Sequence, residues 1–114
     1  MQRWNIIFYP AYGTRHSPEN FLRGLSVSDV ASIEEKLRAI SELEASQWPP
    51  KWVKRIQGIY QLRSGDFRLY FDIDGYTIIV VCHICRKVSQ QARPEDIDRA
   101  KINLKHYFET RKKP

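Results

Sequence analysis

The sequence is short of cysteine and has no long apolar run, and each shortage excludes a class of protein. Two cysteines in 114 residues are too few for a disulfide-rich secreted scaffold, so we expect free thiols. The longest apolar run, Tyr76 to Cys82, is interrupted at Thr77, whereas a membrane-spanning helix needs about 20 apolar residues. The N-terminal residues do not have the form of a signal peptide. We therefore expect a cytoplasmic protein that does not enter a membrane.

Several signatures of enzyme chemistry are also missing. The sequence has no glycine-rich phosphate loop and no nucleophile elbow. Cys82 and Cys85 have the spacing of a metal or redox motif, but a strand would place their side chains on opposite faces. A zinc site usually needs four ligands, and no second cysteine pair occurs. We therefore predict no metal and no cofactor.

Positive charge is what the sequence has in excess, and it is unevenly distributed. The formal net charge is +6. Residues 1–50 hold 5 Lys/Arg against 6 Asp/Glu, whereas residues 51–114 hold 14 against 7. The C-terminal half is therefore expected to bind an anionic partner, with nucleic acid ahead of an acidic protein, unless its charges form only a solvated face.

The first half of the chain predicts a strand followed by two helices. A β-rich run over residues 5–9 ends at Pro10. Ser17-Pro18-Glu19 is typical of a helix start, with an N-cap, a proline and an acid in the first turn. Ser26-x-x-Asp29 resembles a capping box and opens a second helix, so the two form a helical hairpin.

The second half predicts three strands and a last helix. Residues 51–55 form a loop, and strand-like runs follow at 56–63, 67–73 and 77–84. Pro94-Glu95-Asp96 opens the last helix, and residues 109–114 are expected to be a frayed tail. The prediction is one α+β domain over residues 1–114, in the order β-α-α-β-β-β-α. Its helical hairpin and C-terminal helix pack on one face of a mostly antiparallel four-stranded sheet.

The hairpin turns predict which side chains share a face of this sheet. Asp74-Gly75 as a two-residue turn places Phe71 opposite Ile78. Ser64-Gly65 and Gly65-Asp66 are both plausible turns for the earlier hairpin, and both leave the same strand face polar. That face carries Gln61, Arg63, Arg68, Tyr70 and His83, and Lys87 follows the end of the last strand.

The residue types on this polar face suit an RNA phosphate. Arginine offers a planar fork of donors to phosphate oxygens. Histidine can move a proton near neutral pH, and tyrosine can stack on a base. Purely structural roles are the alternative: Arg68 could pair with Asp66 and Asp72, and His83 could bond Asp66. Trp52 could stack on a base, but a tryptophan in a proline-bounded loop more often covers an edge of the core.

Four segments together resemble the RelE/HigB-type toxins of bacterial toxin–antitoxin systems, and most closely the phage-associated HigB-like branch. These segments are residues 58–63, 67–71, 79–87 and 92–100, and residues 17–25 are also similar to the first helix of that branch. The resemblance covers roughly residues 17–108. It implies a RelE-like fold and a cytoplasmic mRNA interferase, an endoribonuclease that needs no metal.

The resemblance also assigns roles to residues. It implies that the RNA 2′-hydroxyl attacks the adjacent phosphate on the ribosome, with Arg63, Arg68, His83 and Lys87 as the catalytic residues. RNA-binding roles are then expected for Gln61, Tyr70, Lys54, Arg55 and Arg86. Lys87 is followed by Val88 where the branch often has a second lysine. Tyr107 falls on the inner face of the last helix, so we transfer no catalytic role to it.

The resemblance further implies a partner, a small helix-turn-helix antitoxin that covers the basic face. A degenerate toxin that binds antitoxin, RNA or ribosome without cleavage is the alternative, and the missing second lysine favours it. A double-stranded RNA binder would be expected to have a basic helix N-terminus, whereas Pro94-Glu95-Asp96 is acidic.

Overall fold

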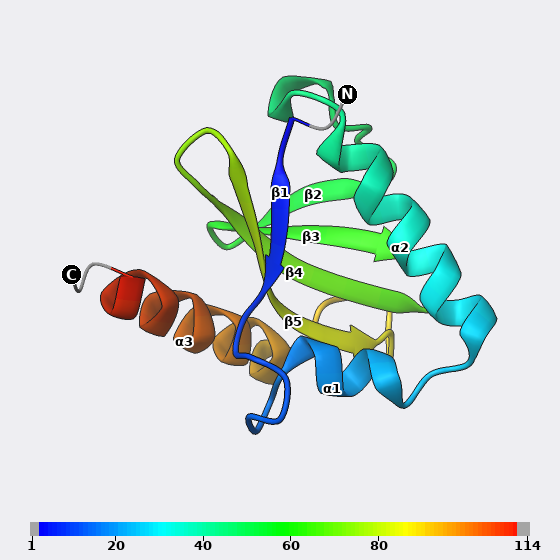
Figure 1. Cartoon of the computed structure of the whole chain (residues 1–114). Coiled ribbons are helices and arrows are strands. Elements are labelled where there is room, and N and C mark those ends of the chain that lie inside the picture. The colour runs from blue at the N-terminus through cyan, green and yellow to red at the C-terminus, as the bar shows by residue number, and fades with distance from the viewer. Residues whose placement is uncertain (1–2, 112–114) are drawn as a thin grey trace.

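The computed structural model describes residues 3–111, which form one sheet with helices on both of its faces (Figure 1). The elements in chain order are β1 (Asn5–Phe8), α1 (Pro18–Arg23), α2 (Val27–Ser41), a short 3₁₀ helix η1 (Ala45–Gln47), β2 (Val53–Ile56), β3 (Ile59–Ser64), β4 (Phe67–Asp74), β5 (Ile78–Arg86) and α3 (Pro94–Arg111). The α+β class is as predicted.

The sheet has five strands, not the four expected, in the order β1-β5-β4-β3-β2. β1 pairs with β5 in parallel, and the other three pairings are antiparallel. The extra strand is β2, most of which falls within the loop predicted over residues 51–55. Gln57 and Gly58, with φ of 51° and 87°, turn the chain between β2 and β3. Positive φ at both central residues is the geometry of a tight hairpin turn, so residues 56–63 are not one strand.

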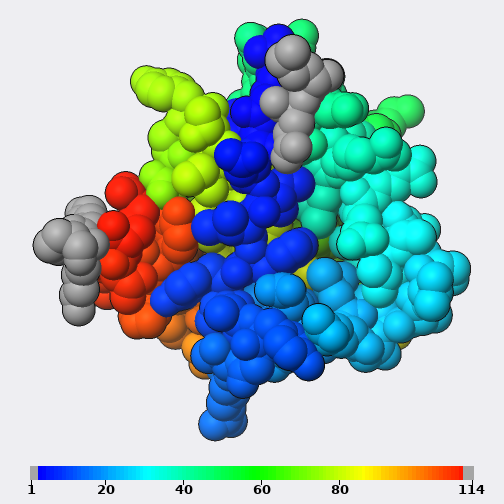
Figure 2. Space-filling view, viewed as in Figure 1, coloured from blue at the N-terminus to red at the C-terminus, as the bar shows by residue number. Residues whose placement is uncertain are grey.

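The helices lie on both faces of the sheet, so the predicted placement on one face is wrong. On one face, apolar side chains of α1 and α2 pack on the side chains of β3 and β4. The helix residues are Leu22, Ile33, Leu37 and Ile40, and the strand residues are Leu62, Leu69 and Phe71. Ile97 and Ala100 of α3 pack on the other face, against Ile59 and Tyr70. Figure 2 shows the segment from β1 through α2, blue to cyan, filling most of one face of the molecule. The strands are therefore buried on both sides, and the alternate side chains serve two cores.

The predicted helix starts are confirmed. The hydroxyl of Ser17 accepts a hydrogen bond from the amide of Asn20, and that of Ser26 accepts one from the amide of Asp29. α3 begins at Pro94 as expected, but it continues through Arg111, so residues 109–111 are helical and not frayed. Residues 112–114 of the predicted tail lie outside the described residues. Within residues 3–111, no helix is both long and apolar enough to cross a membrane.

The β3–β4 hairpin follows one of the two predicted registers. Ser64 pairs with Phe67, so Gly65 and Asp66 form the two-residue turn. Arg63 then lies directly opposite Arg68, and Gln61 opposite Tyr70. Directly paired residues share a face of the sheet. The hairpin therefore places these four side chains together, as expected.

The β4–β5 hairpin departs from the predicted register. Asp74 pairs with Ile78 across a three-residue loop, so Phe71 lies opposite Val81 instead of Ile78. A bulge at Cys82 then shifts the register by one residue, and Tyr70 pairs with His83. The bulged Cys82 carbonyl accepts a hydrogen bond of 2.9 Å from the Asn103 amide of α3. Since the odd loop and the bulge compensate each other, His83 still shares the face of Tyr70 and Arg68.

Candidate functional site

Two arginines lie side by side near the ends of β3 and β4. Arg63 and Arg68 are a directly opposed pair, and both side chains are half-buried. Among residues 3–111, no ion pair involves either of them, so the predicted ladder of Arg68 with Asp66 and Asp72 is not formed. Instead, Arg68 donates from Nη1 to the carbonyls of Gly65 and Phe67, both at 2.8 Å.

This pair of like charges is a cost to the fold that a bound anion would relieve. Opposed like charges on neighbouring strands are destabilising. Burial, and then the charge of Arg63, lower the pKa of Arg68. The Nε atom of Arg63 is buried and has no hydrogen-bond partner among the described residues. Guanidinium groups without an acidic partner are the kind of donor that can bind the oxygens of a phosphate.

Further cations surround the arginine pair. The backbone amide of Lys87 donates to the carbonyl of Asp66 at 2.6 Å, which holds the end of β5 beside the β3–β4 turn. A small cavity of about 20 Å³ adjoins Arg68, and its walls include Lys87, Arg93 and Asp96. We call Arg63, Arg68 and Lys87 the strand-end basic cluster. It unites three of the four predicted catalytic residues at one edge of the molecule.

A larger groove elsewhere has the wrong charge for phosphate. It measures about 550 Å³ and lies between α2 and the β3–β4 turn, where Asp29, Glu35 and Asp66 contribute carboxylates. Trp52 lines this groove, packs against the edge of the core, and has the ammonium of Lys36 at 4.9 Å from its ring centroid. The prediction that Trp52 covers a core edge is confirmed.

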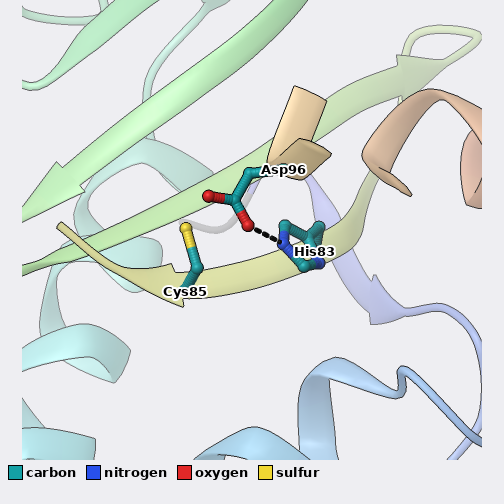
Figure 3. A group of neighbouring side chains, drawn as sticks. All are labelled: His83, Cys85 and Asp96. Atoms are coloured by element: carbon teal, nitrogen blue, oxygen red, sulfur yellow. Dashed lines mark hydrogen bonds and ion pairs between the residues drawn. The ribbon is translucent and has the colours of Figure 1, made fainter. Parts of the chain in front are cut away.

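His83, the fourth predicted catalytic residue, is bonded to α3. Its Nε2 atom lies 2.9 Å from Oδ1 of Asp96 in the first turn of that helix, and Figure 3 shows Cys85 beside the same pair. Arg93 donates from Nε to the other carboxylate oxygen at 2.8 Å. Burial alone would raise the pKa of Asp96, but the bonds from Arg93 and His83 outweigh it and hold this pKa below its ordinary value. The alternative reading of His83 as a half-buried histidine bonded to an aspartate is correct, except that the aspartate is Asp96 and not Asp66.

The two cysteines lie on the same side of the sheet, contrary to the prediction of opposite faces. Both belong to the cluster beneath α3, because the bulge at Cys82 interrupts the alternation of β5. Burial raises the pKa of each thiol to about 12, aided at Cys85 by Asp96. Both thiols are therefore protonated at neutral pH, and neither has the character of a nucleophile.

The predicted RNA-binding residues divide into exposed and buried groups. Gln61 and Tyr70 are buried, and the Gln61 amide donates to the Tyr70 hydroxyl at 3.1 Å, so both side chains are engaged inside the fold and offer little surface to RNA. Lys54 is exposed and lies opposite Gln61, on the face of the arginine pair. Arg55 lies over the ring of Tyr60 and pairs with Asp72 at 3.8 Å. Arg86 is exposed above the ring of Phe67.

Tyr107 is engaged in the fold, in agreement with its predicted inward position. It is buried, and its hydroxyl donates to Oδ2 of Asp74 at 2.8 Å. Arg111 binds the same oxygen at 2.9 Å. Burial, and then the bond to Asp74, raise the pKa of Tyr107 to about 12. This contact fastens the end of α3 to the β4–β5 hairpin.

The raised pKa of Tyr107 predicts a loss of stability in strong alkali. Between about pH 10 and pH 12 the unfolded tyrosine ionises while the folded one keeps its proton, so the free energy of unfolding falls as pH rises. Tyr107→Phe is expected to be less stable than the wild type at pH 8, by about 1 kcal/mol for the lost hydrogen bond. This deficit should shrink above about pH 10, as urea unfolding at several pH values would measure. A deficit that stays constant to pH 12 contradicts the prediction.

Helices on both faces of a mixed sheet define a small α+β domain, and among residues 3–111 two arginines near the strand ends have no acidic partner. The sequence profile of the phage derived protein Gp49-like family (DUF891) matches residues 20–105, and the chain belongs to this family. The family is of the toxin type and is associated with toxin–antitoxin systems. This assignment is to the toxin-type family as a whole and not to the HigB-like branch. No curated protein matches the chain.

Proposed function

We propose that the protein is the toxin of a type II toxin–antitoxin system and cleaves mRNA on the ribosome, as in the HigB-like branch. The observation that carries the proposal is the opposed pair Arg63 and Arg68, which has no acidic partner in the described part of the chain. The membership of the chain in a toxin-type family supports it.

The reaction is a transfer of the phosphate within the RNA itself. The 2′-hydroxyl oxygen attacks the adjacent phosphorus, the bond to the 5′-oxygen of the next nucleotide breaks, and a 2′,3′-cyclic phosphate and a 5′-hydroxyl remain. One proton leaves the 2′-hydroxyl and one is delivered to the departing 5′-oxygen. No metal is needed for this balance.

The strand-end basic cluster would act on the charge that builds up on the phosphorane. Donors fixed where charge develops are each worth about 10² to 10³ in rate. Arg63 and Arg68 would bind the equatorial oxygens, and Lys87, at the exposed end of β5, would assist. His83 is the best candidate for moving a proton, since Asp96 orients its ring.

A binder without nuclease activity is the second candidate, and one observation favours it. The side chain of His83 is only 16% exposed, and its Nε2 atom is already occupied by Asp96. A toxin-like domain that docks to a helix-turn-helix antitoxin, to RNA or to the ribosome would need only the basic cluster and no free proton carrier.

Mapping mRNA 5′ ends after expression of this chain alone separates the two candidates. The nuclease predicts growth arrest and new 5′ ends inside reading frames. A reporter message with its start codon removed should stay intact, because it is not translated. Growth arrest without new ends would support the binder and contradict the nuclease. Co-expression of a helix-turn-helix protein encoded beside the gene should restore growth in either case.

A further inference from the structure

Three different metal-ligating side chains converge beneath the first turn of α3. His83, Cys85 and Asp96 each offer one ligand atom, and these atoms all lie within 4.8 Å of one another. All three side chains are largely buried, and Figure 3 shows them pointing toward a common centre from β5 and from α3. The Asp96 carboxylate also helps burial to raise the pKa of the Cys85 thiol.

The fold builds this convergence from two independent features. His83 and Cys85 are two residues apart on β5, so their side chains project from the same face. The third residue, Asp96, comes from the first turn of α3. Ile97 and Ala100 pack on the sheet and so fix the distance between that turn and β5. The group is thus held by the tertiary structure and not by a flexible loop.

The spacing suits a zinc ion after small side-chain rotations. Zinc binds sulfur at about 2.3 Å and nitrogen or oxygen at about 2.0–2.2 Å, so neighbouring ligand atoms lie about 3.5 Å apart in a tetrahedral site. The His83–Asp96 contact of 2.9 Å would open slightly, and the longest separation, at most 4.8 Å, would close. A set of one sulfur, one nitrogen and one oxygen is typical of zinc and unsuited to magnesium or calcium.

The surroundings supply the remaining parts of such a site. Arg93 holds the second carboxylate oxygen of Asp96 at 2.8 Å, which leaves Oδ1 directed at the other two ligands. Cys85 and Asp96 also line the cavity of about 20 Å³ beside Arg68. A cavity needs about 10–15 Å³ to hold one water molecule, so a water can complete the four ligands.

We propose that His83, Cys85 and Asp96 bind one zinc ion, with a water molecule from the adjoining cavity as the fourth ligand. Binding releases the thiol proton of Cys85 into the solvent, because a coordinating thiol is deprotonated. The neutral imidazole of His83 then carries its proton on Nδ1, which frees the Nε2 atom from its bond to Asp96 for the ion. The ion would link β5 to the start of α3 and stabilise the folded chain.

Zinc would also inhibit RNA cleavage, a consequence that rests on the proposed function. With zinc on Nε2, the ring keeps its one proton on Nδ1, so neither ring nitrogen of His83 can accept a proton from the RNA. Zinc is therefore expected to lower the rate of mRNA cleavage in a translation extract, and a chelator is expected to restore it. Zinc binding is measured without RNA. A chain that binds no zinc therefore contradicts the zinc site alone, and a chain that cleaves no mRNA contradicts the nuclease alone.

The test titrates the purified full-length chain, freed of metal by a chelator, with Zn²⁺ and separately with Co²⁺. We expect one ion per chain, and the Co²⁺ form should show the near-ultraviolet band of a thiolate-to-cobalt transition. Cys85→Ala is expected to abolish that band and to weaken zinc binding by more than about 100-fold, since even outer-shell partners of a metal are worth 10- to 100-fold. Asp96→Asn should weaken binding as well.

Cys82→Ala is the matched control, because Cys82 is a second buried cysteine of the same cluster that does not belong to the converging group. It should bind Zn²⁺ and Co²⁺ like the wild type. Circular dichroism checks that each variant is folded, and the conservative Cys85→Ser replaces Cys85→Ala if the latter is not. The proposal is overturned if the wild type takes up no Zn²⁺ at micromolar concentration, or if Cys82→Ala loses binding as Cys85→Ala does.

Discussion

Arg68→Ala is expected to abolish growth arrest and to reduce mRNA cleavage by about 10²- to 10³-fold, the value of one fixed donor to a developing oxyanion. The same change should leave the fold intact. Within residues 3–111, Arg68 forms no ion pair, and its side chain donates to the carbonyls of Gly65, where water can replace it, and of Phe67. Its removal also relieves the repulsion with Arg63. Growth after induction, counts of new mRNA 5′ ends and urea unfolding measure the two effects separately.

Arg38→Ala is the matched control for the loss of one positive charge. Arg38 is exposed on α2, on the opposite side of the sheet from Arg68. The Arg38→Ala chain should therefore remain toxic. Arg68→Lys keeps the charge without the planar fork, so it should recover only part of the activity. A fully toxic Arg68→Ala chain that accumulates to the wild-type level would refute the role of this residue.

The parts of the fold that could be predicted are those that depend on local chemistry. Ser17 and Ser26 cap helices because a hydroxyl that precedes the first turn can accept an otherwise unpaired amide. The turn near Gly65 is similarly local, and both of its plausible forms put Arg63 on the face of Arg68, while the structure selects the form in which the two lie directly opposite each other. The candidate site could therefore be located from the sequence as far as this one hairpin extends.

The remaining parts depend on contacts between distant segments. No local pattern indicates that Asn103 of α3 bonds the carbonyl of Cys82 and so stabilises a bulge. The contact of His83 with Asp96, and the burial of Gln61 and Tyr70, follow from the docking of α3 on the second face of the sheet. One missed feature had a signal: Gly58 inside a strand-like run is typical of a turn or bulge.

Trp48 illustrates how a residue at the end of a helical region can be central to the core. The prolines that follow it stop any helix, and the segment reads as the start of a loop. In the structure its ring is 6% exposed and lies 5.3–5.7 Å, between centroids, from the rings of Trp4, Tyr60 and Phe71. The indole Nε1 donates to the carbonyl of Ile40 at 2.9 Å, which ties the loop to α2.

Trp48→Ala is therefore expected to lower the free energy of unfolding by about 3–5 kcal/mol, the usual cost of truncating a buried aromatic side chain to alanine. The whole stability of a domain is about 5–15 kcal/mol, so this single change should leave the chain marginal at 37 °C. Urea unfolding followed by circular dichroism measures the loss. In cells the variant should accumulate poorly and lose toxicity through its low level and not through its chemistry.

Two variants separate the contributions of Trp48. Trp48→Phe keeps an aromatic ring but removes the hydrogen bond to Ile40, so it should cost clearly less than the alanine change. Trp52→Ala removes a second tryptophan that is only half-buried at the edge of the core, and a smaller loss is expected there too. If Trp48→Ala lost less than about 1 kcal/mol, the aromatic cluster would not be the anchor between α2 and the sheet, where Trp48 contacts Tyr60 of β3 and Phe71 of β4.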